Sequence, residues 1–386
     1  MHPKPLRIGI VCYPTYGGSG AVATELGRLL ARRGHTIHFL SYARPFRLDG
    51  DFQENIFYHE INAENYPLFQ GQLYTISAAV KIVEIVRNIG LDLIHLHYAL
   101  PHAISAWMAQ EMLGEQRIPM LTTLHGTDIT LVGSKPSFHA AVQLGLDKSD
   151  MLTGVSNWLR AKTCELFRIC NRIRVVYNFI DPELFQPARK KCPRRHFAAD
   201  DEQIVMHISN FRPVKRVEEV VRIFARMQRE VKARLLLIGD GPDREKALAA
   251  AEELGIHDRV ALLGKQPGVE HFLPLADLFL FPSTGESFGL AALEAMASGV
   301  PVVGCRAGGL PEVVIDGECG YLRACDDLDG MAEAGLRVLR DAELRRAMGE
   351  AGRRRAIEEF AADKIIAQYE QVYREMLAGA PACPVG

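Results

Sequence analysis

The chain has 386 residues, with 45 lysines and arginines against 47 aspartates and glutamates, and a formal net charge of -2. This balance excludes a general electrostatic attraction to nucleic acid or to an anionic membrane. Hydrophobic residues make up 48% of the chain and charged residues 24%, as in ordinary globular proteins, and the length predicts two domains.

The cysteines and the apolar segments indicate the compartment. The eight cysteines include no C-x-x-C pair and do not have the spacing of a disulfide framework. Residues 1–6 lack the features of a secretory signal, and no apolar run is long enough to span a bilayer. We therefore expect a cytoplasmic protein without stable membrane association.

Strand-like apolar runs alternate with amphipathic stretches along the first half of the chain. This alternation is typical of βαβ units and predicts a parallel sheet. The predicted strands are Arg7–Tyr13, Ile37–Tyr42, Asp92–Tyr98, Met120–Leu124, Met151–Val155 and Ile173–Tyr177.

The periodicity is lost in residues 178–203, which are rich in proline and basic residues, so a domain boundary is expected there. A second strand series predicts another doubly wound α/β domain. We expect domains at residues 1–185 and 186–360, and a C-terminal helix and tail at 361–386 that packs back on the first domain. The predicted strands of the second series are Ile204–Ser209, Arg234–Ile238, Val260–Leu263, Leu278–Phe281 and Val300–Val303.

The turn after the first strand contains Gly17, Gly18 and Gly20 and precedes a helix expected to start near Ala21. A glycine-rich turn at a helix start can cradle a phosphate. The glycines do not match the G-x-G-x-x-G of dinucleotide dehydrogenases, and the lysine of a P-loop is missing, which disfavours both classes. A purely structural tight turn is the alternative.

Histidines mark the next two strand ends. His95 and His97 alternate on one strand and share a face, as zinc ligands can, but no third ligand has suitable spacing. Hydrogen-bonded histidines are therefore favoured, and Tyr98 at the strand end is the better candidate for ligand binding. His125 lies on a sharp turn, where it can donate to a ligand oxygen or transfer a proton. Asp128 either orients His125 or caps the next segment.

Two basic residues, Arg212 and Lys215, follow the first strand of the second series. Their spacing allows two cations to converge on one diphosphate from a turn and a helix start. A solvated basic helix start is the alternative, although a positive charge there is unfavourable to the helix dipole unless an anion binds.

Two glutamates, Glu286 and Glu294, flank a strand-to-helix turn, and the helix is expected to start near Gly289. The unpaired N–H groups of a helix start favour a pyrophosphate, and glycine allows close approach to the backbone. Ionised carboxylates accept hydrogen bonds from sugar hydroxyls. An exposed loop acid with a helix-surface acid is the alternative.

Taken together, these segments resemble family 4 of the retaining glycosyltransferases. That family has the GT-B fold, an α/β architecture of two Rossmann-like doubly wound domains with the active site in the cleft between them. The resemblance spans nearly the whole chain, and the glutamate pair together with the basic pair is specific in combination and order. The stretches at residues 13–20, 97–103 and 124–130 are most similar to the branch that transfers N-acetylglucosamine from UDP-GlcNAc to the hydroxyl of L-malate, the first step of bacillithiol biosynthesis.

The resemblance implies a reaction that needs no metal and no cofactor. Its expected catalytic residues are Arg212, Lys215, His125 and Glu286, with the two cations stabilising charge on the leaving UDP. His125 and Glu286 would bind the donor sugar, and Glu294 the ribose. The other expected donor contacts are Gly17, Gly18, Asn210, Ser287, Phe288, Gly289 and Leu290, and the expected acceptor pocket is Ser19, Tyr98 and Thr127.

Several alternatives stay open. One is another family 4 transferase, acting on inositol phosphate or on a cell-surface glycan. A UDP-GlcNAc 2-epimerase and a noncatalytic nucleotide-sugar binding protein are further classes. The arginine-rich residues 345–355 could face a membrane, but flanking acids favour a solvated helix face. The sequence leaves the oligomeric state open, including a homo-oligomer.

Overall fold

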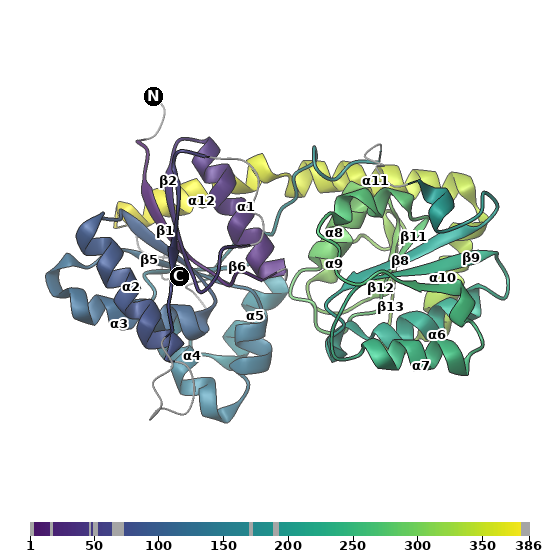
Figure 1. Cartoon of the computed structure of the whole chain (residues 1–386), viewed down its shortest axis with the longest axis horizontal. Coiled ribbons are helices and arrows are strands. Elements are labelled where there is room, and N and C mark those ends of the chain that lie inside the picture. The colour runs from purple at the N-terminus through teal and green to yellow at the C-terminus, as the bar shows by residue number, and fades with distance from the viewer. Residues whose placement is uncertain are drawn as a thin grey trace. The chain divides into compact units, whose positions relative to one another are not determined.

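The computed structural model describes residues 4–15, 18–45, 48, 53–63, 73–169, 173–187 and 193–379. The chain divides into two compact units, the first formed by Met1–Tyr177 with Asp363–Gly386 and the second by Asn178–Ala362. Each unit is an open sheet of parallel strands covered by helices (Figure 1). This confirms the predicted pair of Rossmann-like doubly wound domains.

Unit 1 contains a seven-stranded sheet with the order β3-β2-β1-β4-β5-β6-β7. The order reverses between β1 and β4, where parallel α/β sheets bind ligands beyond the carboxyl ends of their strands. The strands are β1 (Arg7–Val11), β2 (Thr36–Ser41), β3 (Ile56–Glu60), β4 (Leu93–His97), β5 (Met120–Leu124), β6 (Met151–Gly154) and β7 (Ile173–Val175). The helices are α1 (Gly18–Arg32), α2 (Tyr74–Asn88), α3 (Ile104–Leu113), α4 (Pro136–Lys148), α5 (Asn157–Leu166) and α12 (Ala362–Leu377).

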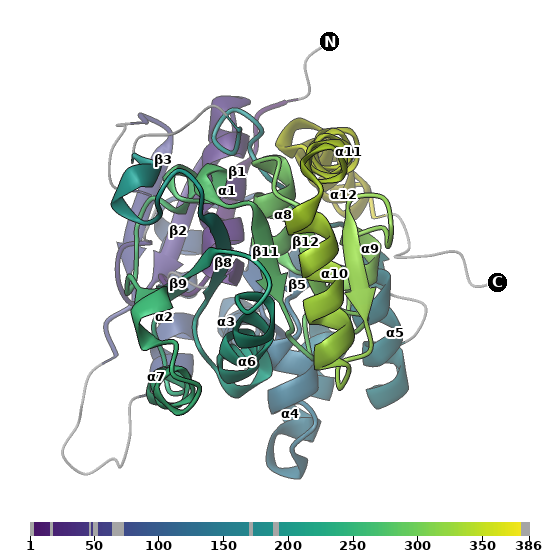
Figure 2. The same cartoon turned by 90° about the vertical axis from the view of Figure 1, so that its right-hand side faces the viewer.

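Unit 2 contains a six-stranded sheet with the order β10-β9-β8-β11-β12-β13, and Figure 2 shows its four central strands side by side. Its switch point lies between β8 and β11. The strands are β8 (Gln203–Ser209), β9 (Ala233–Gly239), β10 (Val260–Leu262), β11 (Leu278–Phe281), β12 (Val302–Cys305) and β13 (Gly320–Arg323). The helices are α6 (Val217–Met227), α7 (Arg244–Glu253), α8 (Leu290–Ala297), α9 (Leu310–Val313), α10 (Leu328–Arg340) and α11 (Ala342–Phe360).

Helix α6 illustrates how the sequence covers these sheets. Val217, Val220, Val221 and Phe224 recur at the spacing of one helix face, and all four side chains are fully buried. Burial of each such side chain contributes about 1.5–3 kcal/mol. Figure 1 shows α6 and α7 on one side of the sheet and α8 and α11 on the other.

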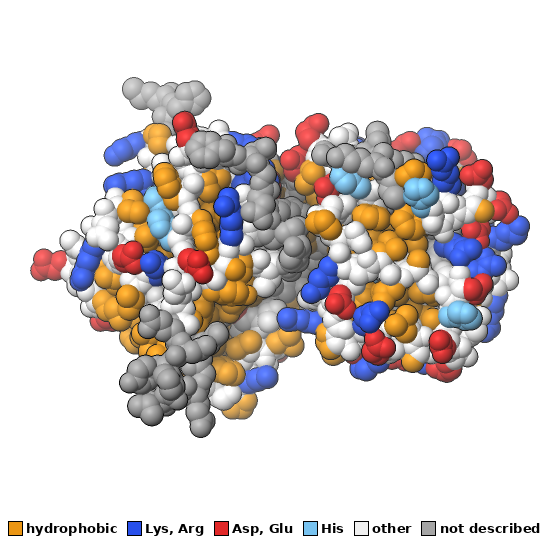
Figure 3. Space-filling model, in the orientation of Figure 1, with side chains coloured by type: hydrophobic (Ala, Val, Ile, Leu, Met, Phe, Trp, Pro, Cys, Tyr) orange, Lys and Arg blue, Asp and Glu red, His pale blue; other side chains and the backbone are white. Residues whose placement is uncertain are grey.

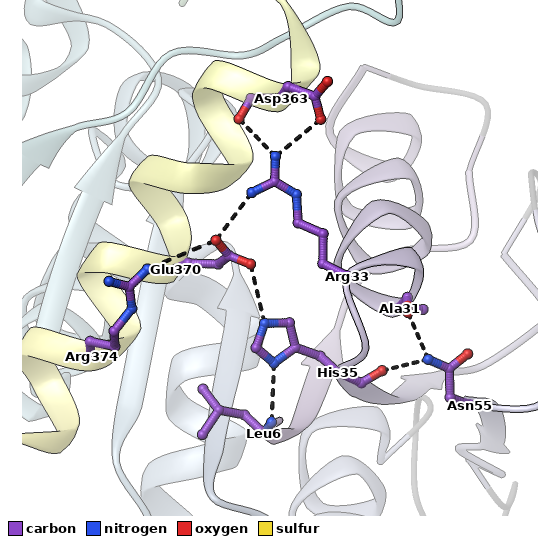
Figure 4. A network of polar contacts seen from close by, with 8 residues as sticks. All are labelled: Leu6, Ala31, Arg33, His35, Asn55, Asp363, Glu370 and Arg374. Carbon is purple, nitrogen blue, oxygen red and sulfur yellow. Dashed lines mark hydrogen bonds and ion pairs between the residues drawn. The ribbon is translucent and has the colours of Figure 1, made fainter. Parts of the chain in front are cut away.

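The C-terminal helix α12 packs on unit 1 through a polar network (Figure 4). The Arg33 guanidinium donates to Asp363 Oδ1 at 3.0 Å and to Glu370 Oε2 at 3.1 Å. Glu370 Oε1 lies 3.3 Å from His35 Nε2, and His35 Nδ1 accepts from the Leu6 amide at 3.1 Å. The turn between α1 and β2 is thereby tied to residues more than 300 positions later in the chain.

The arginines of α11 are not simply a solvated face, and that interpretation of the sequence is wrong for three of them. Arg345 donates to the Leu339 carbonyl near the end of α10 at 3.0 Å. Arg353 donates to the Ala297 carbonyl at the end of α8, and Arg355 donates to the Val313 carbonyl at the end of α9 at 2.9 Å. These guanidinium groups satisfy helix-terminal carbonyls that lack intrahelical partners.

The exposed charges of unit 2 mix both signs. On the face drawn in Figure 3, basic and acidic side chains are interspersed rather than gathered by sign. Arg346 of α11 follows the same pattern, because it pairs with Glu343 at 2.8 Å and with Glu350 at 2.9 Å. Over the described ranges, none of the helices is both long and apolar enough to cross a membrane.

Candidate active site

Each candidate residue follows a strand at a switch point of its sheet or a strand next to such a strand. In unit 1, Ser19 comes after β1, Tyr98 after β4, and His125 with Thr127 after β5. In unit 2, the basic pair follows β8 and the two glutamates follow β11. The topology therefore brings each set to the edge of its sheet where open α/β sheets bind ligands.

Tyr98 is the centre of the unit 1 group. Its hydroxyl donates to Ser19 Oγ at 2.6 Å, and its ring centroid lies 5.2 Å from that of His125. The Tyr98 backbone has a φ of 93°, which is rare for a residue with a side chain and is typical of functional positions. The sequence predicted these three residues individually, but it gave no sign of the positive φ.

The glycine turn is described only in part. Gly17 lies outside the described residues, and Gly18 is the first residue of α1, which begins before the predicted start near Ala21. Gly20 is required by packing, because a Cβ atom there would lie 2.4 Å from the Thr15 carbonyl oxygen. The Thr15 backbone is thus packed tightly against the first turn of α1.

Asp128 braces two loops of the unit 1 group and does not contact the His125 side chain. Its Oδ2 atom accepts from the Ala99 amide at 2.9 Å, and its Oδ1 atom accepts from the Gly126 amide at 3.0 Å. Asp128 is also not the N-cap of the next segment, because it lies within the helical turn Thr127–Val132, whose N-cap is Gly126. Thr127, half-buried at the start of the same turn, is placed by this bracing.

Burial raises the pKa of Asp128 from its ordinary value of 3.8 to about 6, and the hydrogen bonds from Ala99 and Gly126 offset part of this effect. The folded state therefore favours the protonated carboxyl, so its stabilising contribution is complete below the unfolded pKa and is lost as the pH rises through about 6. We expect the stability of the wild type relative to Asp128→Asn to fall by roughly 2 to 3 kcal/mol between about pH 4 and about pH 7. Denaturant unfolding of both proteins measures this difference, and a flat or rising difference would contradict the assignment.

Four histidines gather around the ends of β4 and β5. His97 Nδ1 lies 2.8 Å from His125 Nε2, and His95 Nε2 lies 2.6 Å from Thr123 Oγ1. His102 donates from Nδ1 to the His97 carbonyl. Burial lowers the pKa of His125 and of His95 to about 3 and that of His102 to about 4, and it lowers the pKa of His97 well below 6.5. The four rings are therefore neutral at physiological pH, and their hydrogen bonds join another ring, the backbone or a side-chain hydroxyl.

The zinc interpretation of His95 and His97 gains no support. In the part of the chain that the structure describes, no group of three or more His, Cys, Asp or Glu side chains is arranged to hold a metal ion. His95 uses both ring nitrogens in hydrogen bonds to Thr123 and to Tyr373 of α12. These contacts match the hydrogen-bonded histidines that the sequence favoured.

The turn after β8 is shaped by a histidine that the sequence did not single out. His207 donates from Nδ1 to the Leu280 carbonyl at 2.9 Å and accepts from Ser209 Oγ at 2.8 Å. Ser209 Oγ in turn accepts from the amide of Phe211, which is fully buried with a φ of 41°. The residues on either side of Phe211, Asn210 and Arg212, are exposed.

Lys215 and Glu286 form an ion pair across 71 positions of sequence. Glu286 is buried, and Lys215 also lies over the Phe281 ring at 5.7 Å from its centroid. An ammonium group has three donors, so Lys215 can hold Glu286 and still donate to a phosphate. Arg212 is exposed. The structure thus joins Lys215 of the predicted basic pair to Glu286 of the predicted glutamate pair.

The Glu286 backbone is clamped by two glycines after β12 that were not among the residues predicted from the sequence. The Glu286 carbonyl accepts from the Gly309 amide at 2.7 Å. A Cβ atom at Gly308 would lie 2.1 Å from the Glu286 carbonyl oxygen, and one at Gly309 would lie 2.3 Å from the Ser287 carbonyl oxygen. Only residues without side chains allow this approach, so the Glu286–Ser287 segment is fixed by backbone packing.

Helix α8 begins at Leu290, as predicted, with Gly289 at its N-cap in a left-handed conformation of φ 103°. Glycine offers no side chain to cap the first turn, so the amide groups there remain available to an anion. Phe288 and Gly289 are buried, whereas Ser287, Leu290 and Glu294 are partly exposed. Glu294 lies just over one turn into the helix.

Two family models match the chain. The model described as Glycosyltransferase Family 4 matches residues 16–184, and that described as Glycosyl transferases group 1 matches residues 188–355. The chain is 47% identical over 373 residues to N-acetyl-alpha-D-glucosaminyl L-malate synthase from Bacillus anthracis. The matched residues cover 96% of this chain and 97% of the relative.

More distant relatives extend this comparison. D-inositol 3-phosphate glycosyltransferase from Thermobispora bispora is 31% identical over 344 residues, which are 83% of this chain and 78% of that protein. The structure of sucrose-phosphate synthase from Thermosynechococcus elongatus has a TM-score of 0.80 at 23% identity, over 97% of this chain and all of that one. At that identity the likeness shows a common fold.

Proposed function

This chain belongs to glycosyltransferase family 4, and from that premise we propose that it transfers N-acetylglucosamine from UDP-GlcNAc to the hydroxyl of L-malate with retention at the anomeric carbon. The observation that carries the proposal is the 47% identity to the Bacillus anthracis synthase across 96% of the chain. The reaction would be the first step of bacillithiol biosynthesis.

Unit 2 supplies the groups for the donor. Lys215 and Arg212 follow β8 and would bind the diphosphate, because both are cations next to a helix start. The first-turn amides of α8 would bind the same diphosphate, and Glu294 would accept from the ribose hydroxyls. Glu286, held by Lys215, would accept from the sugar hydroxyls. The other proposed donor contacts in this unit are Ser287, Phe288, Gly289, Leu290 and Asn210, and Gly17 and Gly18 of unit 1 stay proposed donor contacts as well.

Unit 1 supplies the groups for the acceptor. The hydroxyls of Ser19, Tyr98 and Thr127 are donors that a malate carboxylate can accept from, and Tyr98 and Ser19 already bind each other. The proposed role of His125 is to donate to an oxygen of the donor sugar. Because the pKa of His125 is lowered to about 3, it would act as a neutral hydrogen-bond donor rather than as a proton carrier.

The proposed chemistry is a front-face displacement. The malate hydroxyl oxygen forms the bond to the anomeric carbon as the bond to the UDP oxygen breaks, and a donor phosphate oxygen takes the hydroxyl proton. Lys215 and Arg212 would stabilise the negative charge that develops on UDP. On this proposal the reaction needs no metal and no cofactor, so it should proceed in EDTA.

The acceptor pocket can be tested by the pattern of Michaelis constants. We expect Tyr98→Phe and Thr127→Val to raise the KM for malate roughly tenfold, since each removes a hydrogen bond to a charged group, with little change in the KM for UDP-GlcNAc. Steady-state kinetics with each substrate varied in turn measures both constants. An increase in the KM for UDP-GlcNAc alone would mean that Tyr98 and Thr127 do not line the acceptor pocket. Tyr58→Phe, on β3 of the same sheet, is the matched control.

The function itself is tested by UDP release with a panel of acceptors. Purified protein is incubated with UDP-GlcNAc and L-malate, inositol phosphate or no acceptor, with EDTA in every reaction. We expect release that depends on malate. Release only with inositol phosphate would favour the other small-acceptor branch, and UDP release without acceptor accompanied by N-acetylmannosamine would favour the epimerase.

A further inference from the structure

A buried histidine next to the proposed site has no part in the function described so far. His97 is fully buried at the end of β4. Its ring stacks on His95, with centroids 4.5 Å apart, and on His125, with centroids 5.1 Å apart. The only hydrogen bond to its ring within the described chain joins Nδ1 to His125 Nε2 at 2.8 Å.

That hydrogen bond contains one proton, which belongs either to His97 Nδ1 or to His125 Nε2. Both rings are neutral, because burial lowers both pKa values far below the physiological range. If His125 were the donor, the His97 proton would reside on Nε2, which is buried without a hydrogen-bond partner among the described residues. A buried N–H without an acceptor is rarer in proteins than an acceptor without a donor. The proton therefore belongs to His97 Nδ1.

The tautomer of His97 determines that of His125. Since the His125 Nε2 atom accepts from His97, the proton of His125 resides on Nδ1. No described residue accepts a hydrogen bond from His125 Nδ1, and the side chain is partly exposed. The Nδ1–H group is thus available to an oxygen of a bound substrate.

The surroundings hold the His97 ring and backbone in place. His95, on which it stacks, is fixed by Tyr373 at 2.8 Å and by Thr123 at 2.6 Å. His102 donates to the His97 carbonyl, and Tyr74 donates to the other nitrogen of His102 at 3.1 Å. Both neighbours are themselves hydrogen-bonded, so the donor of His97 is held at a fixed position relative to His125.

We propose that His97 is a positioning residue for glycosyl transfer, which donates from Nδ1 to His125 Nε2 and so keeps His125 in the tautomer that offers an Nδ1–H donor to the substrate. The inference rests on the proposed function for its kinetic consequence. Its structural content, the tautomer of His125, does not depend on which substrate the enzyme uses.

The first test reads the tautomer directly in the resting protein. Nitrogen NMR of protein labelled at the histidine rings distinguishes protonated from bare nitrogens, and a His125→Asn sample assigns the His125 signals. We expect a protonated Nδ1 and a bare Nε2 on His125 in the wild type, and a mixture of both tautomers in His97→Leu. A proton on His125 Nε2 in the wild type, or an unchanged spectrum in His97→Leu, would overturn the proposal.

The second test compares two substitutions that both remove the imidazole. An asparagine amide can place an N–H near the position of Nδ1, whereas leucine cannot donate. We expect His97→Leu to lower kcat roughly tenfold to a hundredfold, as loss of an orienting partner does, and His97→Asn to stay within about threefold of the wild type. UDP binding should be unchanged in both, because UDP is assigned to unit 2.

Unfolding measurements separate this role from a merely structural one. Asparagine buries a polar amide at this position and leucine does not, so His97→Asn should be no more stable than His97→Leu even though its kcat is higher. Equal losses of kcat in the two variants would contradict the positioning role. If wild-type His125 shows the expected tautomer but the protein does not glycosylate malate, the proposed function fails and the tautomer assignment stands.

Discussion

Lys215→Ala is expected to lower kcat by roughly a hundredfold or more, because it removes a charge that stabilises the leaving UDP in the transition state. Lys215 follows β8 at the switch point of unit 2 and is held there by Glu286 and the Phe281 ring. Steady-state kinetics with UDP-GlcNAc and malate measures the loss. A kcat within a few-fold of the wild type would show that Lys215 does not stabilise the leaving UDP.

Two controls separate lost chemistry from lost structure. Lys232 also forms an ion pair in unit 2, with Asp201 at 2.6 Å, but both side chains are mostly exposed, so Lys232→Ala should leave kcat within about twofold. Lys215→Ala also leaves the buried Glu286 without its counter-ion. Thermal unfolding measures the cost of that defect, and we expect Lys215→Ala to stay folded at the assay temperature while it loses activity. An unfolded variant would mean that lost structure, rather than lost chemistry, explains the loss.

Gly308→Ala is expected to disable the donor site through the backbone. The new Cβ atom would lie 2.1 Å from the Glu286 carbonyl oxygen, so the Glu286–Ser287 segment must move. A displacement of about 1 Å at a positioned group can lower the rate on the order of a hundredfold. We expect kcat/KM for UDP-GlcNAc to fall at least tenfold, measured by steady-state kinetics.

Gly317→Ala is the matched control for this substitution. Gly317 also has a positive φ, 83° against 64° at Gly308, but nothing lies within 4 Å of the position that its new Cβ atom would take. Both variants lose about 1 kcal/mol from left-handed strain, while only Gly308→Ala adds the clash. Thermal unfolding should show a loss in both, and kinetics should show a loss in Gly308→Ala alone. Normal kinetics in Gly308→Ala would show that Glu286 tolerates displacement.

Much of the fold could be predicted because its central strands are short segments made mostly of apolar residues. β5 and β11 begin and end at the predicted residues. β3 and β13 were missed for physical reasons. β3 is an edge strand whose side chains are only partly buried, and β13 has only four residues, beginning with glycine and ending with arginine. Neither segment has the run or alternation of apolar residues that predicts a strand.

The candidate site was predictable as residue types at strand ends but not as contacts. The sequence places Tyr98, His125, Lys215 and Glu286 after strands, since strand ends are visible as the end of an apolar run. The Lys215–Glu286 pair and the His97–His125 bond depend on which strands are neighbours. Strand order is set by the packing of the whole unit, so no local pattern could reveal these partners.

The residues that hold the site backbone in place are even harder to recognise in the sequence. His207 binds the Leu280 carbonyl of β11 and the Ser209 hydroxyl, and Asp128 binds backbone amides of two loops. Their sequence neighbours do not distinguish such roles from that of an ordinary buried polar residue. Gly308 and Gly309 form a pair shortly after β12, which could have suggested a close approach of two backbones.

The most direct measurement is the mass and anomeric configuration of the product formed from UDP-GlcNAc and L-malate in EDTA. Mass spectrometry identifies the N-acetylglucosaminyl malate, and the coupling of its anomeric proton in NMR reports the configuration. We predict a single product with the α configuration of the donor. A β-linked product would contradict the retaining mechanism, and the absence of any malate adduct would contradict the assigned acceptor.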